Sequence, residues 1–143
     1  MLRKKILYID NDPDILALIT FILGEENIEI IASTTRNITA DILKVRPDLI
    51  LLDEWLDPKK GSIICVEIKE EKTSSHIPVV LISAVNGLEQ IAHDCHADAF
   101  INKPFDIDHL LTVLKKNLLK PVLSLKAAKK TIIVKKNSNY KLI

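Results

Sequence analysis

The sequence predicts an α/β domain in which five parallel β-strands alternate with five α-helices. Two observations support this fold class. Five short runs of residues are almost continuously apolar, as expected for strands that helices cover on both faces of a sheet. Between these runs lie segments in which apolar residues recur at helical spacing. The expected strands span residues 5–9, 28–32, 49–53, 79–83 and 99–102.

The first helix is marked at both of its ends. Asp12 suits the N-cap position, and Pro13 suits the first helical position. Apolar residues then recur along one helical face, and Gly24 ends the segment. The remaining helices are expected over residues 38–45, 62–71, 88–95 and 106–119.

The alternation of strands and helices restricts the topology. Right-handed crossover connections between parallel strands favour a doubly wound sheet. The flavodoxin-like strand order 2-1-3-4-5 places the first and third strands side by side at the switch point, outside which ligands bind. Asp10 and Asp53 then follow neighbouring strands. We therefore predict a flavodoxin-like (βα)₅ doubly wound parallel sheet.

Length and composition fit one domain of this kind. The chain has 143 residues, of which 48% are hydrophobic, so a core can form. Its longest mainly apolar stretch, residues 15–23, is much shorter than the about 20 residues that span a bilayer. The two cysteines, Cys65 and Cys95, give no disulfide framework. We expect a cytoplasmic protein with reduced thiols.

The charge is distributed unevenly along the chain. Residues 1–119 contain all 19 acidic residues and 13 of the 20 basic ones, a formal charge of −6. Residues 120–143 contain seven lysines and no acidic residue, a charge of +7. We place a domain boundary here, with the domain over residues 1–120 and a basic tail over residues 121–143. We expect no membrane partner, and no contact with nucleic acid other than through this tail.

Five polar residues stand at the ends of the predicted strands or directly after them: Asp10, Asp12, Asp53, Ser83 and Lys103. The carboxyl ends of parallel strands meet along one edge of the sheet. Clustered carboxylates suit a hard cation such as Mg²⁺. A hydroxyl and an ammonium group beside them suit a phosphoryl group. The pattern therefore predicts a phosphoryl site.

Four motifs in this order resemble the receiver domain of two-component response regulators. They are the acidic cluster of residues 6–14, residues 47–53 with a glycine at position 61, residues 77–84 and residues 97–105. Each motif alone is a weak signal, whereas their order and spacing together are specific. The resemblance covers residues 1–120.

The resemblance implies a role for each matching residue. Asp53 is the phosphoacceptor, and Ser83 and Lys103 bind the phosphoryl group. The Mg²⁺ ligands are Asp10, Asn11, Asp53 and the backbone carbonyl of Trp55. Phe100 occupies the position of the switch aromatic residue, and the Lys103–Pro104 bond is often cis in the family.

The implied function is signalling rather than enzymatic turnover. The domain would accept a phosphoryl group from a histidine kinase or a phosphotransfer protein. It would then change a surface around the fourth helix, fifth strand and fifth helix for an output protein. We expect a single-domain response regulator or a receiver module without its output region. A homodimer is compatible with this function.

Three departures from the family pattern leave an alternative open. Asn11 replaces the second carboxylate of the acidic pair, and Asp12 is a candidate substitute ligand. Asp57 occupies the usual proline position, with Pro58 one place later. The bulky Trp55 lies two residues after the acceptor Asp53, where its side chain can shield the acyl phosphate from water. The alternative function is a phosphorylation-independent pseudo-receiver that acts as a protein-interaction module.

Two further interpretations are weaker. A flavodoxin that binds FMN would need backbone N–H groups and hydroxyls after the first strand, where this chain has acidic residues. His93 and His96 are three residues apart, as metal ligands on a helix can be. Histidines near the end of a helix are more simply explained by the helix dipole.

Overall fold

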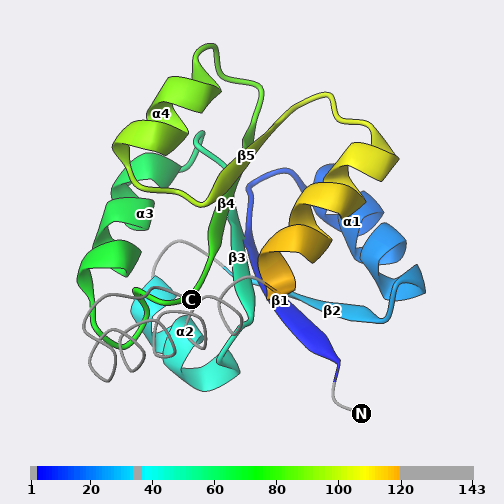
Figure 1. Cartoon of the computed structure of the whole chain (residues 1–143), viewed down its shortest axis with the longest axis horizontal. Coiled ribbons are helices and arrows are strands. Elements are labelled where there is room, and N and C mark those ends of the chain that lie inside the picture. The colour runs from blue at the N-terminus through cyan, green and yellow to red at the C-terminus, as the bar shows by residue number, and fades with distance from the viewer. Residues whose placement is uncertain (1–2, 34–36, 120–143) are drawn as a thin grey trace, which may run out of the picture.

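A computed structural model describes residues 3–33 and 37–119 of the chain. Five strands form one parallel sheet in the order β2-β1-β3-β4-β5 (Figure 1). The strands are β1 (Lys4–Ile9), β2 (Ile28–Ala32), β3 (Leu49–Leu52), β4 (Val79–Ser83) and β5 (Ala99–Asn102). The predicted strand order and all five strands are therefore confirmed. The basic tail predicted over residues 121–143 lies outside the described residues.

Within the described residues, five helices connect or follow the strands. They are α1 (Pro13–Glu25), α2 (Ile38–Val45), α3 (Gly61–Glu70), α4 (Leu88–Asp94) and a C-terminal helix over residues 107–119. The bounds of α2 were predicted correctly, and those of the other helices differ by one residue at one or both ends. In the described part of the chain, no helix combines the length and apolar character that crossing a membrane requires.

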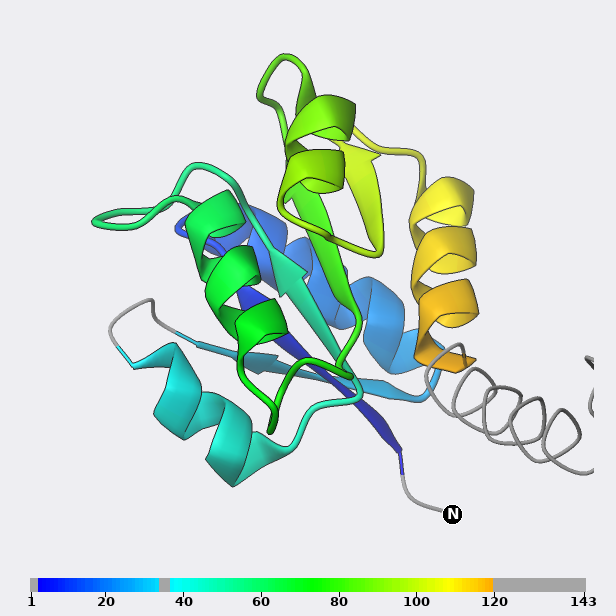
Figure 2. The ribbon, with the colours of Figure 1, turned by 60° about the vertical axis from the view of Figure 1, so that its left-hand side comes forward.

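The helices form two layers around the sheet. The helices α2, α3 and α4 cover one face, and α1 and the C-terminal helix cover the other (Figures 1 and 2). Alternate residues of each strand enter the two layers, since successive side chains point to opposite faces. In β1, Leu7 and Ile9 face α2, α3 and α4, whereas Ile6 and Tyr8 face α1 and the C-terminal helix. Both faces of the sheet are therefore buried.

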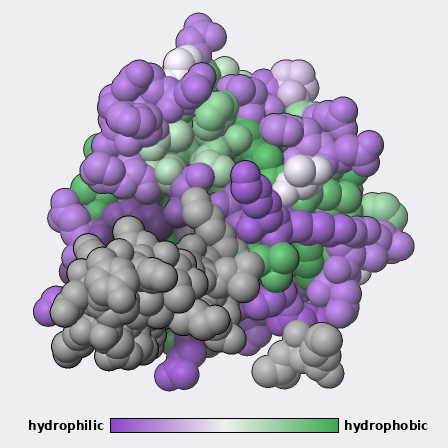
Figure 3. Space-filling view, in the orientation of Figure 1, coloured by the Kyte–Doolittle hydropathy of each residue, from purple (hydrophilic) through white to green (hydrophobic). Residues whose placement is uncertain are grey.

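Polar and charged side chains cover much of the face that Figure 3 presents, where described residues form it. Figure 3 shows small apolar areas separated by polar and charged side chains. Exposed apolar residues include Leu18 and Phe21 on α1. An ion pair between Lys115 and Glu26 joins the C-terminal helix to the end of α1. Leu18 and Phe21 are three residues apart on α1 and therefore lie side by side on the surface of the helix.

The start of α1 has the predicted capping arrangement. The Asp12 side chain accepts hydrogen bonds from the backbone N–H groups of Asp14 and Ile15, at 3.0 and 3.4 Å. Pro13 occupies the first turn, where its missing N–H costs no helical hydrogen bond. The cap fixes the direction in which the chain leaves β1.

Gly61 lets α3 begin directly against the end of β3. A Cβ atom at position 61 would lie 2.0 Å from the carbonyl oxygen of Asp53 and 2.8 Å from its carbonyl carbon. The Gly61 N–H also donates to the carbonyl oxygen of Glu54 at 3.2 Å. Only glycine fits here, because the obstructing atoms belong to the backbone and cannot rotate away.

Gly61→Ala should lower the free energy of unfolding by about 1–3 kcal/mol, the usual cost of forcing extra atoms into a packed site. Urea unfolding of the purified protein measures this change. The matched control is Gly24→Ala, since a Cβ at position 24 meets no atom within 4 Å. This control should be neutral or stabilising by about 0.5–1 kcal/mol, because alanine favours helix over glycine. Equal effects of the two substitutions would contradict the packing argument.

Candidate functional site

Three residues from distant parts of the chain meet at the carboxyl ends of the strands. The Lys103 Nζ atom lies 2.7 Å from Asp10 Oδ2 and 3.0 Å from Asp53 Oδ2. The side chains are 15%, 2% and 9% exposed, in the order Lys103, Asp10, Asp53. A buried ammonium group therefore bridges two buried carboxylates, as the positions of these residues predicted.

The sheet fixes the backbone positions of Asp10, Asp53 and Lys103. Asp10 and Asp53 directly follow β1 and β3, which are neighbours in the sheet, and the Asp53 N–H donates to the Ile9 carbonyl at 3.1 Å. Lys103 directly follows β5, and its N–H donates to the Ser83 carbonyl at 2.9 Å. The Lys103–Pro104 peptide bond is cis, as the resemblance implies. The lysine reaches the two carboxylates across the end of β4.

The pKa shifts of Asp10 and Lys103 favour the charged form of each group. Burial by itself would raise the pKa of Asp10, but hydrogen bonds from Lys103, Tyr8 and the Asp12 N–H outweigh it and lower that pKa. Burial would likewise lower the pKa of Lys103, but the bonds to Asp10 and Asp53 raise it. The stability that Asp10 contributes is therefore lost as pH falls through its lowered pKa. The contribution of Lys103 is lost only as pH rises through its raised pKa, so the ion pair of Lys103 with Asp10 is intact at neutral pH.

Tyr8 also belongs to the site, although its sequence position did not indicate this. Its hydroxyl donates to Asp10 Oδ2 at 2.6 Å, and the residue is fully buried. Burial and then the neighbouring Asp10 raise the pKa of Tyr8 above its ordinary value, so the phenol stays protonated. A tyrosine two positions before a strand-end aspartate points to the same face of the sheet, and this spacing is the signal that could have revealed the contact.

The two residues after Asp10 differ in their surroundings. The Asp12 backbone N–H donates to Asp10 Oδ1 at 2.9 Å, and the Asp12 carboxylate caps α1. Asn11 is exposed and lines an open pocket together with Trp55, Leu56, Asp57, Pro58 and Lys60. Asn11 therefore lies at the surface, against the loop that follows Asp53. The role of Asp12 as a substitute metal ligand stays a prediction.

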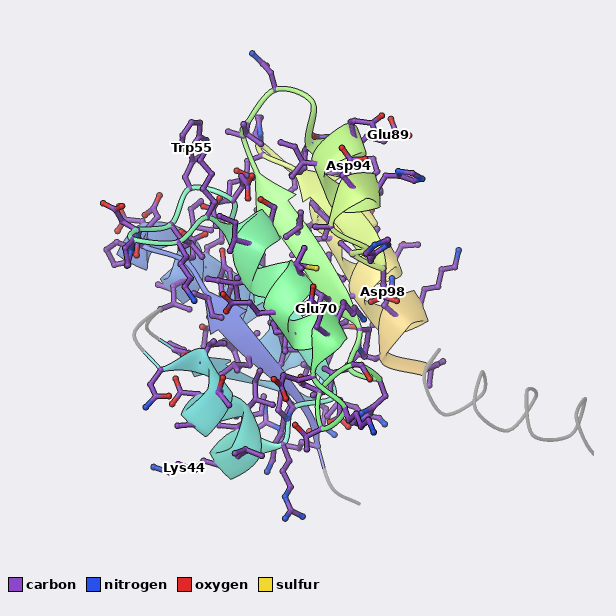
Figure 4. The ribbon with its side chains drawn as sticks, turned by 90° about the vertical axis from the view of Figure 1, so that its left-hand side faces the viewer. Lys44, Trp55, Glu70, Glu89, Asp94 and Asp98 are labelled. Atoms are coloured by element: carbon purple, nitrogen blue, oxygen red, sulfur yellow. The ribbon has the colours of Figure 1, made fainter. Side chains whose placement is uncertain are left out.

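The loop after β3 holds the Asp53 carboxylate by a second contact. The Trp55 backbone N–H donates to Asp53 Oδ1 at 3.0 Å. The Trp55 side chain is 60% exposed and stands out from this loop, at the end to which the strands point (Figure 4). The same loop contains a cis Asp57–Pro58 peptide bond.

Glu54 is a second residue that the sequence did not single out. It is buried directly after Asp53, and its carboxylate accepts from the Ser62 N–H at 2.6 Å and from the Ser62 hydroxyl at 3.0 Å. Lys60, the N-cap residue of α3, makes no capping bond with its side chain. Glu54 therefore caps α3 from the preceding loop, and this bond helps to fix the backbone beside Asp53.

Ser83 and Phe100 lie beside the bridge rather than in it. Ser83 ends β4 and is fully buried, and its hydroxyl accepts from the Val85 N–H at 3.4 Å. Phe100 pairs with Leu81 across the β4–β5 ladder, and its half-buried ring packs against the core on the α4 side. Both residues thus lie on the strand pair that leads from the site toward α4.

The donor set of the site is rich in oxygen. Asp10 and Asp53 supply carboxylate oxygens that already face one cation, the Lys103 ammonium group. Asn11 directly follows Asp10, and the Trp55 carbonyl belongs to the loop after Asp53; their roles as metal ligands stay predictions. Oxygen donors of these kinds suit Mg²⁺. Within residues 3–33 and 37–119, no three His, Cys, Asp or Glu side chains group as a metal site, and His93 is an exposed residue in the last turn of α4.

Acidic residues at the amino ends of the strands accept hydrogen bonds that stabilise the fold. Asp48 accepts from the Lys5 N–H at 2.8 Å. Asp98, labelled in Figure 4, accepts from Lys69 Nζ at 2.7 Å and from the Val79 N–H at 2.8 Å. These carboxylates connect the amino ends of neighbouring strands. They therefore lie away from the site, which is at the carboxyl ends.

Comparison with known proteins identifies related sequences. The DNA-binding dual master transcriptional regulator RpaA of Synechocystis is 30% identical over 111 residues, which are 75% of this chain and 46% of RpaA. The nitrogen assimilation regulatory protein NtrX of Azorhizobium caulinodans is 35% identical over 120 residues, 79% of this chain and 26% of NtrX. The chain thus spans about half of the first relative's length and about a quarter of the second's.

A solved structure agrees with these relatives. The crystal structure of NtrX from Brucella abortus in complex with ADP matches with a TM-score of 0.77 and 31% identity, covering 88% of this chain and 29% of that one. The response regulator receiver domain family matches residues 6–115. These residues contain the three-residue bridge, the loop after β3 and all five strands except the start of β1. The chain therefore belongs to the receiver domain family of two-component response regulators.

Proposed function

We propose that this domain accepts a phosphoryl group on Asp53 and thereby switches a surface that binds a partner. The observation that carries the proposal is the Lys103 ammonium group between Asp10 and Asp53, at 2.7 and 3.0 Å, in a chain of the receiver family. A carboxylate repels an incoming phosphoryl group unless positive charge offsets the repulsion. Positioning and electrostatics are the main means by which proteins promote phosphoryl transfer.

In this proposal Lys103 changes partner during the reaction. An Asp53 oxygen forms a bond to phosphorus as the bond from phosphorus to the imidazole nitrogen of a phosphohistidine breaks. The Lys103 Nζ atom is already within 3.0 Å of Asp53 Oδ2, so a small movement would bring it to the phosphoryl oxygens. The donor would be a histidine kinase or a phosphotransfer protein.

Mg²⁺ fits the residues of the site, because two carboxylates already share one cation there. Asp10, Asn11, Asp53 and the Trp55 carbonyl would hold it, and it would supply positive charge to the transferring group. Asp12 would contribute only if it left its capping position on α1. The residues that bind the ion and those that bind the phosphoryl group, Ser83 and Lys103, would thus surround Asp53.

Phe100 and Ser83 connect the proposed site to the surface. Ser83 pairs with Asn102, and Leu81 pairs with Phe100, in the ladder between β4 and β5. A turn of the buried Ser83 hydroxyl toward a phosphoryl group would change the packing beside Phe100. The surface around α4, β5 and the C-terminal helix would then present a different shape to an output protein.

The second candidate function is a pseudo-receiver that binds partners without phosphorylation. The neutral amide of Asn11 favours it, because this residue would supply a metal site with no charge. In both proposals the domain extends over residues 1–120, and residues 121–143 form a separate basic tail that is a candidate contact for nucleic acid. Phosphorylation of Asp53 distinguishes the two functions.

Asp53→Asn should abolish labelling by a small-molecule phosphodonor such as acetyl phosphate. Asparagine keeps the shape of the side chain and an oxygen for the Trp55 N–H or Lys103, so the fold should survive. Intact-protein mass spectrometry would measure the added phosphoryl mass. The control, Asp108→Asn at an exposed position on the C-terminal helix, should label like the parent. Labelling of the Asp53→Asn variant at the parent's level would place the acceptor elsewhere, and an unlabelled parent would favour the pseudo-receiver.

Asn11→Asp should tighten Mg²⁺ binding by about tenfold or more. One charge at 4 Å is worth about 4 kcal/mol at an effective dielectric of about 20, of which desolvation and carboxylate repulsion remove much. Tenfold corresponds to about 1.4 kcal/mol. Titration of Trp55 fluorescence would report binding, since Trp55 is the single tryptophan and shares a pocket with Asn11.

The control for this substitution is Asn27→Asp, which adds the same charge at an exposed position between α1 and β2. It should leave the Mg²⁺ affinity nearly unchanged. If Asn11→Asp binds Mg²⁺ no better than the parent, then Asn11 does not face the ion, and the assignment of the ligands is wrong.

A further inference from the structure

Tyr8 is a phenol in a strand segment that is otherwise aliphatic, Ile6-Leu7-Tyr8-Ile9. Its ring packs in the core between the sheet and the layer of α1 and the C-terminal helix, and the residue is 0% exposed. A phenylalanine would fill the same space without burying a hydroxyl. Burying a hydroxyl is costly unless it forms a hydrogen bond. The Tyr8 hydroxyl forms that bond with a residue of the proposed site, Asp10 Oδ2, at 2.6 Å.

Three donors surround the Asp10 carboxylate, whose side chain is 2% exposed. Oδ2 accepts from the Tyr8 hydroxyl and from Lys103 Nζ, and Oδ1 accepts from the Asp12 N–H. Two of these donors are fixed by rigid elements, because Tyr8 is in β1 and the Asp12 backbone begins α1. Lys103 is different, since it reaches from the loop after β5 on a flexible stem and is shared with Asp53.

We propose that Tyr8 is a positioning residue that holds the Asp10 carboxylate in place when Lys103 moves to the phosphoryl group. This inference rests on the proposed function. An ionised carboxylate can only accept hydrogen bonds, so the Tyr8 hydroxyl must be the donor. Without it, Oδ2 would lose both of its donors at the step when the carboxylate has to face the cation.

Asn11, which stands where the family has a second carboxylate, makes the hydrogen bond between Tyr8 and Asp10 more important for binding a cation. A carboxylate at position 11 would add a second negative charge to the proposed cation site. Asn11 has a neutral amide instead, and the residue is exposed. Because the Asp12 carboxylate caps α1, Asp10 is the charged ligand that the segment after β1 would supply in the proposed site. The orientation of a single charged ligand affects affinity directly. Partners that orient metal ligands typically change affinity by about 10–100-fold when they are removed.

Tyr8→Phe removes the hydroxyl and keeps the ring in the core. We expect it to weaken Mg²⁺ binding at least about tenfold, as read by Trp55 fluorescence in the full chain. The matched control is Ile6→Val, which alters a buried residue on the same face of β1 without touching a polar contact. It should lower stability slightly and leave the Mg²⁺ affinity within about twofold of the parent's. A general loosening of the core would affect both variants alike.

A double-mutant cycle with Asp10→Asn tests whether Tyr8 acts through Asp10. In the Asp10→Asn background, with Mg²⁺ titrated to higher concentration, Tyr8→Phe should cause no further loss of affinity. An undiminished effect of Tyr8→Phe in that background would overturn the inference, as would an unchanged affinity of the single variant. If the parent shows no response to Mg²⁺, the proposed function fails and the role of Tyr8 fails with it. A responsive parent with an equally responsive Tyr8→Phe variant would overturn the role of Tyr8 alone.

Discussion

The ion pair of Lys103 with Asp10 and Asp53 is the interaction on which the rest of the site depends. It joins residues that are 93 and 50 positions apart in the chain, and so it links the ends of β1, β3 and β5. Two buried carboxylates on neighbouring strands would repel each other without a cation between them. Removing one partner from a buried ion pair usually costs about 3–5 kcal/mol. In the proposed function, the same arrangement would prepare Asp53 for an incoming phosphoryl group, because Lys103 could leave one anion for another.

The surrounding elements keep this bridge in place from several sides. The strand order 2-1-3-4-5 brings Asp10 and Asp53 to adjacent positions, and the bond from Lys103 to the Ser83 carbonyl anchors the lysine beside β4. Gly61 allows the start of α3 to pack on the Asp53 backbone, and Glu54 caps that helix from the loop between them. Each contact is local, yet together they leave Asp53 little freedom to move away from Lys103.

Much of this structure could be predicted from the sequence, because strand ends carry strong signals. Apolar runs located the five strands, and polar residues directly after them located Asp10, Asp53 and Lys103. The capping role of Asp12 also follows from the Asp-Pro pair. The contacts of Tyr8 and Glu54 were missed, although Tyr8 stands two positions before Asp10 on the same face of β1. Glu54 meets Ser62 only because the loop after β3 turns back onto the start of α3, and the sequence does not show that turn. Gly61 was matched by its position, whereas the reason for glycine, a carbonyl oxygen 2.0 Å from any Cβ, appears only in three dimensions.

The most direct test of this account uses beryllofluoride, which mimics the acyl phosphate. The parent chain would be titrated with beryllofluoride at saturating Mg²⁺, and Trp55 fluorescence would be followed. We expect a saturable change that requires both Mg²⁺ and beryllofluoride and that disappears in Asp53→Asn. No change in the parent, or an equal change in the Asp53→Asn variant, would contradict the claim that the Lys103 bridge marks a phosphoryl site on Asp53.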